Sequence, residues 1–263
     1  MAARTDELIR AQPAPHRRSG SGAPLVLVHG FLGGSAQWEA EIAHFSSSYD
    51  VIAPDLPGFG DAGTLPGRDR IEGMADYVIE FLDNLGIKSF ALLGHSMGGM
   101  IVQAIAAKIP DRIDRLVLYG TGPLGIMPNR FETIGKSRER LIEDGVQKTI
   151  RRVGATWVLD SETAAGTSIV EQLASIGDCA SREAALRAYD GMEDWDGRAH
   201  LEHFPMPTLI LWGDTDRSYR WPQIETLWQK IPNSTLAVIP GTSHAAHLEK
   251  PRLVHAVLED FLS

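Results

Sequence analysis

Short apolar runs alternate with longer amphipathic stretches along most of this chain. The runs lie at 25–28, 49–54, 90–93, 116–119, 208–212 and 235–239, and helical spacing occurs at 36–45, 70–85, 100–107 and 251–262. Several runs are apolar at every position instead of every second one, which is typical of strands buried on both faces of a parallel sheet. The alternation predicts an α/β fold, with a mostly parallel sheet and flanking helices.

The segment 122–203 breaks this rhythm because it contains no strand-like run. Stretches around 138–158 and 171–189 have helical spacing instead. A helical insertion between two sheet strands predicts a cap over the carboxyl ends of the strands, where open α/β sheets bind ligands. We therefore expect a core of residues 1–121 and 204–263 and an inserted helical cap of residues 122–203. A longer structural crossover is the alternative.

Composition and charge argue against several classes of function. The 263 residues carry a formal net charge of −9, which argues against a general nucleic-acid or anionic membrane surface. The single cysteine, Cys179, rules out an intrachain disulfide and a cysteine-based zinc cluster. No metal motif or glycine-rich phosphate loop is present, so we expect no cofactor and no metal.

No apolar run reaches the length of a membrane span, and the polar residues 1–22 lack the apolar core of a signal peptide. We expect a cytoplasmic protein, a monomer or homodimer, that acts on a small molecule and binds neither nucleic acid nor membrane.

The stretch 94–99, GHSMGG, carries the strongest chemical signal. It follows an apolar run and precedes an apolar helical stretch. A serine flanked two residues away by Gly94 and Gly98, between strand and helix, is the pattern of a nucleophile elbow. Such a turn lifts the Oγ of Ser96 clear of the sheet, where it needs a base and an anion site to react. A glycine-rich turn without chemistry is the alternative interpretation.

Two later loops can supply the partners of Ser96. The order expected after such an elbow is serine, acid, histidine. The loop after 208–212 offers Asp214 and Asp216, and the loop after 235–239 offers His244 and His247. Position after a strand does not by itself choose within either pair.

Together, these motifs resemble the α/β-hydrolase fold family, in particular its serine esterase and enol-lactonase-like members with a helical cap. The resemblance begins near residue 24 and includes HGF at 29–31, DLPGFG at 55–60 and the elbow. It also includes Gly213 three residues before Asp216, and His244 ahead of Glu249 and Pro251. The family pattern implies Asp216 as the acid and His244 as the base.

An oxyanion hole of two backbone N–H groups is expected beside the nucleophile. One belongs to Met97, the residue after the nucleophile. The resemblance places the other on Phe31, in the loop after the early strand. Asp61 stands where relatives usually have a small hydroxyl residue, and we have no functional interpretation of that departure.

Four side chains are candidates for the substrate pocket: His29, His95, Trp157 and Trp195. A histidine in the place of His29 more often supports the oxyanion loop than touches substrate, and the favoured interpretation of His95 is that it faces the core or a neighbouring loop. The two tryptophans, with Met127, lie in the expected cap, where we expect specificity to be set. Plain cap core is the alternative for both tryptophans.

The residue types at the elbow narrow the reaction. Ser96 argues against the dehalogenase and epoxide-hydrolase branches, which attack with a carboxylate. His95 before the nucleophile and Ala245 after the base differ from the carbon–carbon hydrolases of aromatic meta-cleavage, which tend to carry Asn and Trp there. We expect hydrolysis of a small carboxylic ester or (enol-)lactone through an acyl-enzyme on Ser96. A carbon–carbon bond hydrolase of the meta-cleavage type, or a hydrolase-fold ligand sensor with slow or no turnover, stays open as an alternative.

Overall fold

A computed structural model describes residues 14–126 and 130–263. Its centre is a seven-stranded sheet in the order β1-β3-β2-β4-β5-β6-β7. All neighbouring strands are parallel except β1, which runs antiparallel to β3. The strands are β1 His16–Gly20, β2 Ala23–Val28, β3 Tyr49–Pro54, β4 Phe90–His95, β5 Ile113–Tyr119, β6 Thr208–Gly213 and β7 Ser234–Ile239.

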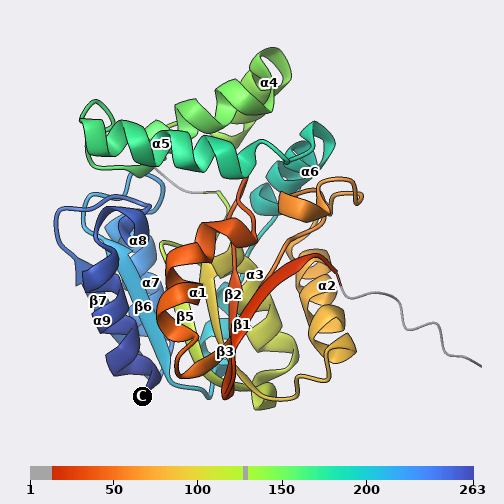
Figure 1. The fold of residues 1–263 in the computed structure, drawn as a ribbon, viewed down its shortest axis with the longest axis vertical. Helices are drawn as coiled ribbons and strands as arrows, with labels where there is room; N and C mark the ends of the chain where they lie inside the picture. Colours follow the sequence, from red (N-terminus) through yellow and green to blue (C-terminus); the bar gives the residue numbers. More distant parts are fainter. Residues whose placement is uncertain (1–13, 127–129) are drawn as a thin grey trace, which may run out of the picture.

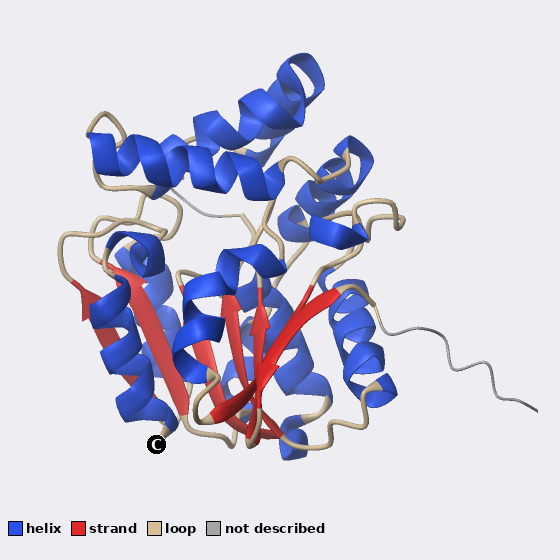
Figure 2. Ribbon diagram, viewed as in Figure 1, coloured by secondary structure: helices blue, strands red, loops and turns tan. Residues whose placement is uncertain are grey.

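Helices cover both faces of this sheet (Figure 2). They are α1 Glu39–Phe45, α2 Ile71–Asn84, α3 Met97–Lys108, α7 Trp221–Lys230, α8 Ala246–Glu249 and α9 Pro251–Leu262, with short 3₁₀ turns η1 Ser35–Trp38, η2 Gly60–Ala62, η3 Pro110–Arg112 and η4 Arg198–His203. Alternate residues of one strand enter different cores: Val26 and Val28 pack with α2 and α3, whereas Leu25 and Leu27 pack with α1 and α9. Burial on both faces explains why the strands are continuously apolar.

Three further helices lie between β5 and β6 in the chain: α4 Ile134–Trp157, α5 Ala164–Gly177 and α6 Arg182–Glu193. They lie together over one end of the sheet (Figure 1) and form the inserted helical cap. The expected fold class is thereby confirmed, while the cap boundaries at 122 and 203 stay predictions. The stretch expected to be helical around 171–189 contains parts of two helices, α5 and α6, which begin after side-chain caps from Thr163 and Ser181.

Strand β1 is the element that the sequence pattern does not predict. Its residues HRRSG are mostly exposed and contain no apolar side chain. As an edge strand it contributes little to the core, and charged edges resist unwanted strand pairing. Arg18 makes a two-pronged ion pair with Asp50 on β3, at 2.8 and 2.6 Å.

None of the helices within 14–126 and 130–263 combines the length and the apolarity needed to cross a bilayer. The expected cytoplasmic location stays a prediction.

The cap contacts the core at the loop after β3. Gly58 in this loop has a φ of 86°, and a Cβ built on it would lie 2.0 Å from the Cβ of Ala184 in α6. Its carbonyl accepts a hydrogen bond of 2.9 Å from the N–H of Ser181. Only glycine permits both this backbone conformation and this approach.

We expect Gly58→Ala to lower the free energy of unfolding by roughly 2 kcal/mol or more, because strain at positive φ adds to the clash with α6. Gly73→Ala in α2 is the matched control, since a Cβ there meets nothing within 4 Å and alanine is the better helix former. Urea unfolding measures both variants. Equal stability of the two would show that the cap does not depend on this contact.

Candidate active site

Ser96 occupies a strained turn between β4 and α3. Its backbone has a φ of 58° and a ψ of −120°, a conformation that non-glycine residues rarely adopt. A Cβ on Gly94 would lie 2.2 Å from the carbonyl oxygen of Gly98, and a Cβ on Gly98 would lie 2.3 Å from that of Val28. Both glycines are therefore needed for α3 to approach β4 and β2 this closely, and that approach holds Ser96 in its turn.

A buried acid–base pair lies on the two later loops. The Nδ1 of His244 and the Oδ2 of Asp216 are 2.8 Å apart, and each residue is 1% exposed. The other carboxylate oxygen of Asp216 accepts the backbone N–H groups of Ser218 and Tyr219, at 2.7 and 3.1 Å. Because a carboxylate can only accept here, Nδ1 carries the proton and Nε2 is the free acceptor. Nε2 is buried and has no hydrogen-bond partner among the described residues.

The structure distinguishes the two candidate acids, Asp214 and Asp216, and the two candidate bases, His244 and His247, by their contacts. Asp214 is exposed and accepts the N–H groups of Gly241 and Thr242, at 2.8 and 3.3 Å, so it joins the acid loop to the base loop. His247 is the second residue of the short helix α8, and its Nδ1 lies 2.9 Å from the hydroxyl of Tyr119. Geometry thus brings Asp216 to His244 and leaves Asp214 and His247 in supporting positions. The catalytic roles of Ser96, Asp216 and His244 stay predictions.

A narrow cavity lies beside Ser96, between core and cap. Its volume is about 20 Å³, roughly the room of one water molecule. The cap supplies Val153, Trp157 and Met192 to its lining, and the core supplies Phe31 and Tyr219. The ring of Tyr219 stacks on His244, with centroids 5.6 Å apart.

Of the four expected pocket side chains, the structure places only Trp157 in this lining. Both ring nitrogens of His29 are engaged, by the Gly30 carbonyl at 2.8 Å and the Leu56 N–H at 3.0 Å. His29 therefore supports the loop after β2. Trp195 is buried in the cap core, and its carbonyl accepts the N–H of Gly125. Met127 lies outside the described residues.

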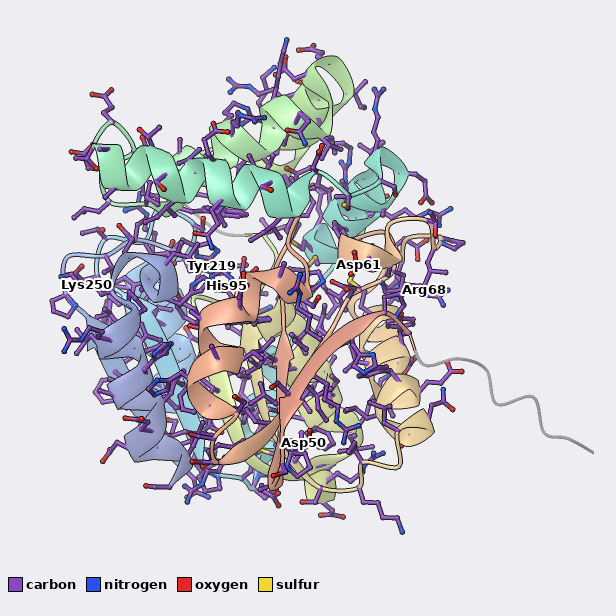
Figure 3. All side chains as sticks on the ribbon, in the orientation of Figure 1. Asp50, Asp61, Arg68, His95, Tyr219 and Lys250 are labelled. Carbon is purple, nitrogen blue, oxygen red and sulfur yellow. The ribbon has the colours of Figure 1, made fainter. Side chains whose placement is uncertain are left out.

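His95 acts on the backbone of His244 and does not line the described cavity. Its Nδ1 accepts from Gln37 at 3.0 Å, and its Nε2 donates to the carbonyl of His244 at 3.0 Å. The hydroxyl of Tyr119 lies 3.2 Å from the same carbonyl. Figure 3 labels His95 and Tyr219 close together beneath the cap, and both rings contact His244. His95 is thus a positioning residue for the base.

The loop of His244 is also joined to the cap. Glu249 accepts the N–H of Ser243 and the N–H of Leu159, both at 2.7 Å. The carbonyl of Trp157, the last residue of α4, accepts the N–H of Ala245 at 2.8 Å. The sequence motif contains Glu249 without revealing this link, because the cap partner lies 90 residues away in the chain.

The expected oxyanion donors lie near Ser96. Met97 is the first residue of α3, so its N–H has no partner within the helix, and the positive end of the helix dipole lies beside it. A Cβ on Gly30 would lie 3.1 Å from the Cβ of Ser96, which brings the loop of Phe31 against the nucleophile. The donor roles of Phe31 and Met97 stay predictions.

Asp61 and the single cysteine lie away from this cavity. Asp61 and Cys179 line a separate cavity of about 250 Å³, and Cys179 is exposed. Neither supplies a role in the site. Sequence reasoning missed Tyr119, Gln37, Ser218, Tyr219 and Arg130. Of these, Ser218 and Tyr219 lie two and three residues after Asp216, and that proximity in the chain is the available signal.

The buried histidines around the site predict a dependence of stability on pH. Burial lowers the pKa of His29, His95 and His247, the last to about 4. Each is then neutral in the folded protein but protonated in the unfolded chain below a pH of about 6.5. Stability is therefore full above that pH and falls as the pH drops, by up to about 1.4 kcal/mol per pH unit for each histidine.

We expect His247→Gln to make the free energy of unfolding less dependent on pH between pH 6.5 and 4. The reduction should equal the contribution of one histidine, up to about 1.4 kcal/mol per pH unit. The measurement is the free energy of unfolding in urea at several pH values for both proteins. Parallel curves for wild type and variant would contradict the assignment.

Comparison with known proteins places the fold in a family. A sequence profile of the alpha/beta hydrolase fold matches residues 23–251. The (E)-2-((N-methylformamido)methylene)succinate hydrolase of Acinetobacter baylyi is 26% identical over 277 residues, covering 100% of this chain and 98% of its own length. The 3-oxoadipate enol-lactonase 2 of the same species is 26% identical over 238 residues, covering 90% and 87%. A malate-bound structure of a thermophilic esterase from Thermogutta terrifontis matches with a TM-score of 0.86 at 28% identity, covering 94% of this chain and 92% of that one. The chain belongs to the alpha/beta hydrolase fold family.

Proposed function

We propose that this protein is a serine hydrolase that cleaves a small carboxylic ester or lactone through an acyl-enzyme on Ser96. His244 acts as general base and then as general acid, and Asp216 orients it. The backbone N–H groups of Phe31 and Met97 stabilise the oxyanion. The protein needs no cofactor for this reaction, and it acts in the cytoplasm.

One observation carries the proposal: a buried Asp216–His244 pair whose free Nε2 has no partner in the described part of the chain. An imidazole whose Nδ1 is held by a buried carboxylate and whose Nε2 is left without a protein partner has the arrangement that a general base requires. A nucleophile–base hydrogen bond is often long until substrate binds. The strained turn that presents Ser96 beside the same cavity supports its role as the nucleophile.

The reaction follows from these positions. Nε2 of His244 takes the proton of Ser96 as Oγ attacks the carbonyl carbon, and the carbonyl oxygen becomes an anion between the two N–H donors. Collapse expels the alcohol, which takes the proton back from His244. Water then attacks the acyl-enzyme with His244 as base again, and the acid leaves with Ser96 restored.

The names of the relatives support a hydrolysis reaction, but they do not agree on the type of bond that is cleaved. Two of them are named as an enol-lactonase and an esterase, and a third is named as a hydrolase of a substituted methylenesuccinate. Ester and lactone substrates have carbonyl groups that suit an acyl-enzyme, so they are the bonds we assign.

We expect Asp216→Asn to lower kcat by roughly 1,000-fold or more, since the imidazole loses its orienting carboxylate. Asp214→Asn is the matched control, because its amide oxygen can still accept the two loop N–H groups; a change of a few-fold is expected. Steady-state kinetics on p-nitrophenyl butyrate measure both, with Ser96→Ala as the inactive reference. A larger effect at Asp214 would reassign the acid, and activity in Ser96→Ala or single turnover in the wild type would refute the proposed reaction.

We also expect a preference for short acyl chains, because the cavity at Ser96 is narrow and covered by the cap. The ratio of kcat/KM for p-nitrophenyl butyrate to that for p-nitrophenyl palmitate should be large, with no activation at an oil–water interface. The reverse order, with interfacial activation, would identify the cap as a lipase-type lid.

A further inference from the structure

Arg130 lies at the junction of two cavities. One is the narrow cavity beside Ser96, and the other is an outer cavity of about 300 Å³ lined by α4, α6 and residues of 125–126 and 130–133. The two linings share Gly125, Arg130 and Ile134. A molecule that occupies both cavities would therefore lie against Arg130.

The carboxylates around this junction already have ion-pair partners, whereas Arg130 has none among the described residues. Glu132 and Glu193 line the outer cavity, but each already pairs with arginines of the cap: Glu132 with Arg152 at 2.5 Å, and Glu193 with Arg138 at 2.9 Å. Arg130 forms no ion pair with any carboxylate of the described residues. Its Nη1 donates to the Glu132 carbonyl at 3.0 Å and lies 3.4 Å from the Ser137 hydroxyl. A guanidinium has five N–H donors in a planar fork, so donors remain for a ligand.

Arg130 is also the one charged side chain in the described lining of the cavity at Ser96. Burial raises the pKa of Tyr219 in that lining to about 12, and the positive charge of Arg130 acts against this rise. The guanidinium is thus close enough to influence the ring that stacks on His244. An anionic group bound by Arg130 would belong to a molecule that also reaches Ser96.

We propose that Arg130 binds a carboxylate of the substrate, so that the preferred substrates are small esters or lactones that carry a carboxylate away from the scissile bond. This inference rests on the proposed function. A guanidinium matches a carboxylate with two parallel hydrogen bonds, which gives orientation as well as affinity. The net charge of −9 does not attract anions to the protein as a whole, so the selectivity depends on this local cation.

The kinetic test compares matched anionic and neutral substrates. These are the mono-p-nitrophenyl esters of glutaric and adipic acid against p-nitrophenyl pentanoate and hexanoate. We expect the wild type to prefer the anionic esters. Arg130→Gln should lose roughly 10- to 100-fold in kcat/KM on them, mainly through KM, with the neutral esters changed by no more than a few-fold. Arg130→Lys should retain part of the preference, since it keeps the charge but loses the fork.

Arg182→Gln is the control for the loss of one cap charge. Arg182 lies on α6, is exposed, and donates to the carbonyl of Ile142; its substitution should leave the preference unchanged. A fall of equal size on anionic and neutral esters in Arg130→Gln would indicate a structural role and overturn the proposal. A preference that persists in that variant would overturn it as well.

A binding measurement separates this inference from the proposed reaction. Calorimetric titration of adipate into the wild type and into Arg130→Gln requires no turnover. Adipate binding that is lost in the variant supports the inference even if no ester is hydrolysed, and in that case only the proposed reaction fails. Equal adipate binding by both proteins, or none by the wild type, overturns the inference even if esters are hydrolysed.

Discussion

The close approach of α3 to the ends of β2 and β4 is the constraint on which the site depends. Gly98 touches the backbone of Val28, and Gly94 touches the backbone of Gly98. This contact forces Ser96 into a strained turn, brings the loop of Gly30 against it, and directs the first N–H groups of α3 toward the space above the sheet. Strain of this kind persists only where the surrounding packing determines it.

Four side chains hold His244 and its loop in place. His95 and Tyr119, at the ends of β4 and β5, hold its carbonyl; Asp214 joins its loop to the loop of the acid; and Glu249 ties it to the cap. The end of α4 bonds to the same loop, since the carbonyl of Trp157 accepts the N–H of Ala245. The loop that carries His244 and the cap that covers the cavity therefore share hydrogen bonds.

Most of the fold follows from local pattern, because the buried parallel strands and the helices between them have clear periodicities. The elbow and the two loops could also be found, since turn chemistry and chain order restrict where nucleophile, acid and base can lie. Strand β1 could not, because an exposed edge strand has no apolar signature. The hydrogen bond of His95 could not be predicted either, because its partner is a backbone carbonyl 149 residues away. The same holds for the unpaired charge of Arg130, which depends on which cap carboxylates of the described residues are already paired.

The two carboxylate oxygens of Asp216 have different partners. One oxygen of Asp216 meets His244, while the other meets two main-chain donors, from Ser218 and Tyr219. These donors belong to the loop and would stay in place if the side chain were shortened. With alanine at this position, the two main-chain N–H groups and Nδ1 of His244 would lose the carboxylate that they now share. Added formate has the two oxygens that these donors require, so it would be the small molecule of choice to restore the missing carboxylate.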